Sequence, residues 1–301
     1  MRVEDIRKIL ILGSGTMGQQ IGLLCAVHGY EVAIYDISDD ILEKAEARIR
    51  RRAGKMAAAG HVSEAAAQEA LHRISFTADP ENAARNVDLV SESVPEDPRL
   101  KGNVLSEFNQ LCGEHTLFTT NTSSLLPSQF AEATGRPDRF LALHFHDTLM
   151  TKIVDIMPHP GTSAETTALV TAFAESIGQI PIVLHKEHHG FVFNNMLMAL
   201  LDSALNLASQ GIASVQDIDR SWMGVMHSMV GPFGIMDSVG LDTVYKITDY
   251  WAEQLDSPKA RKNAAFLKTY IDQGKFGMKS GGGFYDYPGP AYANPQFLMK
   301  K

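Results

Sequence analysis

The chain has 301 residues, of which 45% are hydrophobic and 21% are charged, and its formal net charge is −8. This length exceeds one average domain, and the composition is that of a soluble globular protein with a full core. The negative charge argues against general nucleic-acid binding, because a phosphate backbone is held by summed basic charge.

The sequence shows no targeting or membrane segment. The N-terminal stretch "MRVEDIRKILILG" places acidic residues before a short apolar run, unlike a secretory signal. No stretch approaches the roughly 18 apolar residues of a membrane span. Cys25 and Cys112 lie in apolar, helix-like segments, so two buried thiols are favoured over a disulfide or a metal site. We therefore predict a cytoplasmic protein with no nucleic-acid or membrane partner and no metal site.

Short apolar runs alternate with amphipathic segments over the first part of the chain. Strands are predicted at 8–13, 31–36, 87–93, 116–121, 139–145 and 180–185, and helices at 38–58, 62–72, 98–112 and 163–177. The strands carry little polar alternation, as expected for strands that are covered on both faces. Strands that alternate with helices imply right-handed crossovers and a mainly parallel, doubly wound sheet.

The strand signals stop after residue 187. A long helix is predicted over 190–211 and closed by Gly211, and the next helix begins at the cap Ser214. Further helical stretches are predicted over 231–256 and 260–273. The sequence therefore predicts an α/β domain over residues 1–186 and an all-helical domain over 187–301.

A glycine-rich turn follows the first predicted strand in "ILILGSGTMGQQIG". Gly13 permits a tight turn, Gly15 lets the backbone approach a pyrophosphate, and Gly18 allows close packing of helix on strand. The second strand ends in Asp36, which is placed to accept hydrogen bonds from a ribose and would repel a 2′-phosphate. This context favours a Rossmann-like site for NAD over NADP, and over a βαβ turn without a ligand.

A basic helix is predicted at "EARIRRRAGK", residues 46–55. Its basic side chains recur at three- and four-residue spacing, which places them on neighbouring helical faces. One interpretation is a solvated face that Glu43 and Glu46 balance. The other is a site for the phosphates of an anionic substrate such as coenzyme A, formed by Arg51, Arg52 and Lys55.

His144 ends the apolar strand in "RFLALHF". A histidine at such a position is usually a buried core residue whose ring nitrogens are hydrogen-bonded. The carboxyl end of a parallel strand, however, faces the crevice in which α/β sheets bind ligands, and Ser123 follows another such strand. His146, His188 and His189 lack supporting geometry, so we interpret them as polar surface or linker residues, with a metal cluster as the less favoured alternative.

Several motifs follow in order: "SESVPEDPRLKGNV", "TTNTSSL", "LHFHD", "HHGFVFNN", "GPFGIMDSVGLD" and "KSGGGFYDY". Together they resemble the NAD-dependent L-3-hydroxyacyl-CoA dehydrogenases of fatty acid metabolism, including the short-chain 3-hydroxybutyryl-CoA enzymes. The resemblance runs from about residue 7 to residue 287. It implies an oxidoreductase that uses NAD, takes an acyl-CoA substrate, and forms a homodimer through its helical domain.

The resemblance also implies residue roles. His144 matches the catalytic histidine, Asp155 the carboxylate behind it, and Ser123 and Asn194 the polar active-site residues. Asp237 and Asp242 match positions that we interpret as structural. The predicted cofactor-binding set is Gly13, Gly15, Thr16, Met17, Gly18, Asp36, Glu96, Lys101, Asn121, Ser123 and Lys279.

The sequence departs from the family pattern at the substrate end. The family carries glutamate twelve residues after the histidine, whereas Asp155 lies eleven after His144. "HFHDT" places Asp147 where asparagine is usual, and "HGFVFNN" lacks a proline and an arginine. These changes leave two alternatives open: a dehydrogenase of a free 3-hydroxy acid, of the carnitine or gulonate type, and a crystallin-like cofactor-binding protein without turnover. The methionine-rich stretch 221–234 is suited to an acyl pocket or to plain helical core.

Overall fold

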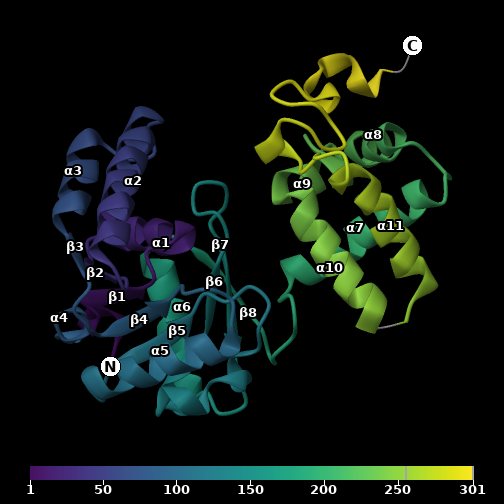
Figure 1. Ribbon diagram of the computed structural model, residues 1–301. Coiled ribbons are helices and arrows are strands. Elements are labelled where there is room, and N and C mark those ends of the chain that lie inside the picture. Colours follow the sequence, from purple (N-terminus) through teal and green to yellow (C-terminus); the bar gives the residue numbers. More distant parts are fainter. Residues whose placement is uncertain (255, 300–301) are drawn as a thin grey trace. The chain divides into compact units, whose positions relative to one another are not determined.

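The computed structural model describes residues 1–254 and 256–299 and divides into two compact units, Met1–Val192 and Phe193–Lys301 (Figure 1). Residue 255, inside the predicted helical stretch 231–256, lies outside the described residues. The same holds for residues 300–301, at the end of the predicted second domain.

The first unit is built on one sheet, to which the described residues contribute eight strands in the order β3-β2-β1-β4-β5-β6-β7-β8. All neighbouring strands are parallel except β6 and β7, so the predicted mainly parallel sheet is confirmed. The strands are β1 (Lys8–Leu12), β2 (Glu31–Tyr35), β3 (Ile74–Thr77), β4 (Leu89–Glu92), β5 (Leu117–Thr120), β6 (Phe140–Phe145), β7 (Ile153–Pro158) and β8 (Ile180–Val183).

Two of these strands, β3 and β7, are missing from the sequence prediction. β3 is short and only partly buried, so it lacks a clear apolar run. β7 is buried over its four central residues, but Asp155 interrupts its apolar pattern. A charged residue inside a buried strand hides that strand from a prediction based on hydrophobicity.

Helices cover both faces of the sheet, which explains the continuous apolar strands. Ile9 and Ile11 of β1 pack into a core with α1, α2, α3 and α6, whereas Leu10 and Leu12 pack into a second core with α4 and α5. The helices are α1 (Thr16–Val27), α2 (Asp39–Ala58), α3 (Glu64–His72), α4 (Pro80–Ala84), α5 (Pro98–Leu111) and α6 (Ala164–Ser176). The α/β class predicted from the sequence is confirmed.

The second unit is helical, as predicted. Its helices are α7 (Phe193–Ser209), α8 (Val215–Met226), α9 (Pro232–Val239), α10 (Leu241–Gln254) and α11 (Pro258–Ile271), with α10 packed on α11 (Figure 1). Ser214 caps α8, and its hydroxyl accepts a hydrogen bond from the Asp217 N–H at 3.1 Å. The predicted single stretch over 231–256 is wrong, because Gly240 adopts φ +99° and separates α9 from α10.

A buried carboxylate holds the last loops of the second unit to α9. Asp237 accepts hydrogen bonds from the Phe284 and Tyr285 N–H groups at 2.9 and 3.0 Å and from the Tyr287 hydroxyl at 3.0 Å. Burial raises the pKa of Asp237, and these hydrogen bonds oppose the shift. The motifs "GPFGIMDSVGLD" and "KSGGGFYDY" thus contact each other inside the helical unit.

Both cysteine thiols are buried and neither forms a disulfide, as predicted. Burial raises the pKa of Cys25 to about 12 and that of Cys112 to about 11. These thiols therefore act as small apolar core groups. Among the described residues, no helix has the length and apolar character that crossing a membrane requires.

Candidate active site

The glycine loop lies where the strand order reverses, between β1 and β4. Gly13 adopts φ +96°, and a Cβ atom there would lie 2.8 Å from the Ser93 carbonyl oxygen. A Cβ atom on Gly18 would collide with the Gly13 carbonyl oxygen, whereas one on Gly15 would have open space around it. Thr16 and Met17 then begin α1. The backbone is therefore crowded on its inner side and open at Gly15, which is what a pyrophosphate requires.

Asp36 directly follows β2 and faces the glycine loop. One carboxylate oxygen accepts hydrogen bonds from the Ser14 N–H and hydroxyl, each at 2.7 Å, and the other accepts the Ile37 N–H at 2.9 Å. A carboxylate offers about four acceptor positions, so Asp36 can also accept ribose hydroxyls. The donor set of the loop and this acid fit NAD.

A buried ion pair that the sequence did not reveal lies beneath the next loop. The Lys101 ammonium group lies 2.8 Å from Glu92 and 3.3 Å from Glu96, and the side chains of Lys101 and Glu92 are 1% and 0% exposed. The Thr120 hydroxyl donates to Glu92 at 2.6 Å. Glu92 is the last residue of β4 and follows an apolar run. The hydrophobic pattern therefore predicts the strand but not the buried ion pair at its end.

Glu96 organises the loop after β5. Its carboxylate accepts hydrogen bonds from the Thr122 hydroxyl at 2.5 Å and from the N–H groups of Ser123 and Ser124 at 3.1 Å each. Partial burial would raise the pKa of Glu96, but these hydrogen bonds and the Lys101 charge lower it overall. For Glu92, burial prevails over the Lys101 charge and raises the pKa. Glu96 and Lys101 thus position the exposed Ser123 loop.

The side chains of Asn121 and Gln20 connect neighbouring segments at the carboxyl ends of the strands. The Asn121 side-chain oxygen accepts the Phe145 N–H at 2.8 Å, which links the ends of β5 and β6. The Gln20 side chain accepts the Thr148 N–H at 2.9 Å and donates to Asp147 at 3.4 Å, which links α1 to the loop after β6. The segments that carry the glycine loop, Asn121 and His144 are therefore joined at one edge of the sheet.

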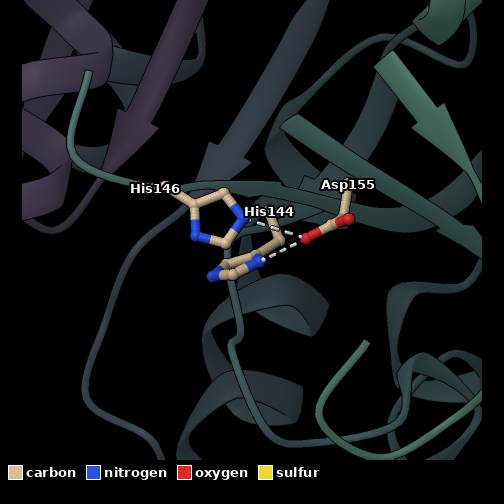
Figure 2. Close-up of side chains that lie close together, drawn as sticks. All are labelled: His144, His146 and Asp155. Carbon is tan, nitrogen blue, oxygen red and sulfur yellow. Dashed lines mark hydrogen bonds and ion pairs between the residues drawn. The ribbon is translucent and has the colours of Figure 1, made fainter. Parts of the chain in front are cut away.

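His144 and Asp155 are direct partners across two antiparallel strands. The register of β6 and β7 pairs these two residues, and His144 Nδ1 lies 3.2 Å from Asp155 Oδ2 (Figure 2). Side chains directly opposite in an antiparallel pair have Cβ atoms about 4.5–5.5 Å apart, so a short aspartate suffices to reach the imidazole. The spacing of eleven residues is the consequence of this register.

His146 contacts the same carboxylate, so its interpretation as a polar surface or linker residue is wrong. It lies two residues beyond His144, and side chains two apart in an extended chain share a face. His146 Nε2 lies 3.1 Å from Asp155 Oδ2, the oxygen that His144 also contacts (Figure 2). The two imidazoles meet edge to face, with ring centres 4.6 Å apart.

This pair of imidazoles keeps Asp155 ionised. Burial would raise the pKa of Asp155, but the hydrogen bonds from His144 and His146 lower it to about 2. Asp155 is 1% exposed and His144 is 5% exposed, and the Phe191 ring lies 4.8 Å from the His144 ring. The result is a carboxylate–imidazole pair in a largely apolar setting, suited to proton transfer.

The basic helix is α2. Arg51 and Lys55 are exposed, and Arg52 is partly buried. Among the described residues, nothing accepts a hydrogen bond from the buried Nη1 of Arg52. Glu46 is bound instead to Arg50, at 2.6 Å. Both interpretations of this face, a solvated surface and a phosphate site, therefore stay predictions.

The remaining predicted site residues lie in the second unit. Asn194 is the second residue of α7, and Lys279 forms an ion pair with Asp242 at 2.6 Å. In the methionine-rich stretch 221–234, Met223 is buried, whereas Val225 and Met229 are 75% and 90% exposed. The interpretation of this stretch as plain helical core is therefore wrong for Val225 and Met229.

Comparison with known proteins identifies the class to which this fold and site belong. Residues 8–188 match the family model described as "3-hydroxyacyl-CoA dehydrogenase, NAD binding domain", and residues 190–287 match that of the C-terminal domain. The chain belongs to the 3-hydroxyacyl-CoA dehydrogenase family. This confirms the family, the NAD-dependent dehydrogenase class and the NAD cofactor predicted from the sequence.

Three relatives illustrate the range of the family. The chain is 32% identical to human mitochondrial hydroxyacyl-coenzyme A dehydrogenase, over 94% of this chain and 91% of the relative. Among solved structures it is similar to (S)-3-hydroxybutyryl-CoA dehydrogenase from Ralstonia eutropha, with 30% identity, TM-score 0.85, and 94% and 100% of the two chains covered. It is also similar to a diketoreductase that acts on dicarbonyl compounds, with 40% identity, TM-score 0.86, and 94% and 99% covered.

Proposed function

We propose that the protein interconverts a short-chain 3-hydroxyacyl-CoA and the corresponding 3-ketoacyl-CoA, with NAD as the hydride carrier. The observation that carries this proposal is the His144–Asp155 hydrogen bond at the sheet edge that also carries the glycine loop. Ligands of open α/β sheets bind at the carboxyl ends of the strands, where the strand order reverses.

His144 is the proton-transfer group in this proposal. NAD, when bound, takes the hydride from the secondary alcohol. His144 Nδ1–H donates to Asp155, so the lone pair of Nε2 is available to accept the hydroxyl proton. The ionised Asp155 fixes this tautomer and stabilises the imidazolium that forms. The family resemblance assigns Ser123 and Asn194 the role of hydrogen-bond donors to the substrate oxygen as charge develops on it.

The exposed basic residues of α2 support a coenzyme A ester as substrate. Phosphate groups are bound by clustered lysine and arginine side chains, and Arg51 and Lys55 are exposed and Arg52 partly buried. Replacing Arg51 and Arg52 by glutamate should raise the KM for acetoacetyl-CoA far more than the KM for NADH, whereas Arg85→Glu, at an exposed position before β4, should change neither. Equal effects on both substrates would refute this site.

A second candidate substrate class is a free 3-hydroxy acid or dicarbonyl compound. The 40% identity to a diketoreductase favours it, as do the departures at Asp147 and Asp155. The two classes separate in one experiment. The protein is mixed with NADH and acetoacetyl-CoA, with NADH and a free dicarbonyl compound, and with NAD and free 3-hydroxy acids, while the absorbance of the reduced cofactor is followed. Turnover of the CoA ester alone supports the main proposal, and turnover of the free compounds alone supports the second.

His144→Ala tests the site itself. Turnover should fall below detection while the dissociation constant for NADH stays within about twofold, because His144 acts on the substrate proton and not on the cofactor. Loss of NADH binding, or of the fold, would assign His144 a structural role. Binding of NADH by the unaltered protein without turnover of any substrate would instead indicate a crystallin-like protein.

Residues 1–186 form the NAD-binding domain, and residues 187–301 bind the acyl chain and pair with a second copy. The exposed Val225 and Met229 support a homodimer, because large apolar side chains on a surface mark contact sites. The net charge of −8 disfavours nucleic acid as a partner, and two buried thiols without a disulfide support a cytoplasmic location.

A further inference from the structure

Three metal-ligating side chains converge at the end of β6. His144, His146 and Asp155 each offer one ligand atom, and these atoms all lie within 4.8 Å of one another. Two of the separations are 3.2 Å, from His144 Nδ1 to Asp155 Oδ2, and 3.1 Å, from His146 Nε2 to the same oxygen. The dehydrogenase chemistry requires the first of these contacts. The second is not needed for it.

The two separations from Asp155 Oδ2 match those within a transition-metal site, whereas the two imidazole nitrogens lie within 4.8 Å of each other. Zinc bonds to imidazole nitrogen at about 2.0–2.1 Å, so two ligands of a tetrahedral site lie about 3.3 Å apart. An ion beside Asp155 takes the place of the two imidazole protons once the rings turn to bring their nitrogens to this spacing. Three protein ligands also leave one position open, and the His146 side chain, at 17% exposed, provides the contact with solvent.

The donor set also selects the class of ion. Two imidazole nitrogens and one carboxylate oxygen suit Zn²⁺ and other divalent transition metals, whereas Mg²⁺ and Ca²⁺ prefer oxygen ligands throughout. We propose that His144, His146 and Asp155 bind one divalent transition-metal ion such as Zn²⁺, and that the bound ion inhibits the dehydrogenase. The inhibitory part rests on the function proposed above, and the metal site does not.

The inhibition follows from the tautomer of His144. Without a metal, Nδ1–H donates to Asp155 and the lone pair of Nε2 accepts the substrate proton. A metal bound at Nδ1 needs the lone pair of that nitrogen, so the single proton of the neutral ring moves to Nε2. A ring protonated at Nε2 cannot accept another proton there. The metal thus removes the base while every residue of the site stays in place.

Metal binding is measured first, because it requires no turnover. The full-length protein, treated with a chelator and desalted, is titrated with Co²⁺ while visible absorbance is followed, and Zn²⁺ affinity is measured by competition with a chromophoric chelator. We expect one ion per chain and a Co²⁺ spectrum of four-coordinate type. His146→Phe should weaken Zn²⁺ binding at least about tenfold, since the loss of even an outer-shell partner costs about 10- to 100-fold. His61→Phe, an exposed histidine between α2 and α3, should leave binding unchanged.

His146→Gln provides a second variant if His146→Phe does not fold, because glutamine keeps the polarity of the position but is a poor zinc ligand. Zinc affinity that is the same in unaltered protein and in a folded His146 variant would overturn the site. So would the absence of stoichiometric binding.

Turnover is measured second, with acetoacetyl-CoA, NADH and increasing free Zn²⁺, and each variant is compared with its own metal-free rate. We expect inhibition at the zinc concentration that fills the site, reversal by a chelator, and at least about a tenfold higher inhibitory concentration for the His146 variant. One bound ion with full turnover would overturn the inhibition but leave the site. Zinc binding with no turnover of any substrate would refute the proposed function alone.

Discussion

Replacing Asp155 by asparagine removes one charge and almost no volume from the centre of the site. Asp155 is 1% exposed, and its Oδ2 atom faces both His144 Nδ1 and His146 Nε2. An asparagine oxygen in the place of Oδ2 has two lone pairs and can still accept both hydrogen bonds, so the strand pairing and the ring positions should persist. What disappears is the negative charge opposite the imidazolium that forms during the reaction.

The size of the effect follows from the geometry. Unit charges about 4 Å apart attract by about 4 kcal/mol at an effective dielectric constant of about 20. Each 1.36 kcal/mol of lost transition-state stabilisation lowers a rate tenfold, so kcat should fall by about 10³-fold. The dissociation constant for NADH should stay nearly constant, because the charge acts on the proton acceptor.

The assay is the steady-state reduction of acetoacetyl-CoA by NADH at pH 7, with NADH binding followed by fluorescence. Asp138→Asn, an exposed aspartate before β6, serves as the matched control and should keep full activity. A loss of less than tenfold for Asp155→Asn would refute the role of its charge. A large loss of NADH affinity, or a lower melting temperature that accounts for the lost activity, would show that Asp155 holds the fold instead.

Three further predictions follow from burial and exposure. Lys101→Met leaves the carboxylate of Glu92 buried without its partner, so the free energy of unfolding measured in urea should fall by about 3–5 kcal/mol. Adding Glu92→Gln should restore part of this loss. Unchanged stability of Lys101→Met would contradict the ion pair. The pKa of Asp155, about 2 against an ordinary 3.8, means that its stabilisation is present above about pH 4 and lost as the pH falls towards 2. Asp155→Asn should therefore show a flatter dependence of unfolding free energy on pH over that interval, and parallel curves for the two proteins would exclude this linkage. Val225→Glu with Met229→Glu should convert a dimer into a monomer in analytical ultracentrifugation, and an unchanged sedimentation coefficient would place the dimer contact elsewhere.

Local patterns in the sequence determined most of the fold and the nucleotide site. The positive φ at Gly13, the packing of Gly18 against β1 and the acid at the end of β2 belong to one βαβ unit, whose residue spacing determines its geometry. The class of the sheet follows from the same kind of information, because buried parallel strands are continuous apolar runs. His144 was recognisable as a site residue because it ends such a run.

Only the tertiary structure decided the surroundings of His144. Asp155 interrupts the apolar pattern of β7, so the antiparallel pairing that sets it opposite His144 left no periodic signal in the sequence. The role of His146 is hidden in the sequence for the same reason, since Asp155 becomes its neighbour only when that pairing forms. Glu92 and Lys101 are charged residues that burial tolerates because they contact each other. Cross-strand register and mutual burial join separate segments of the chain, and no local spacing records them.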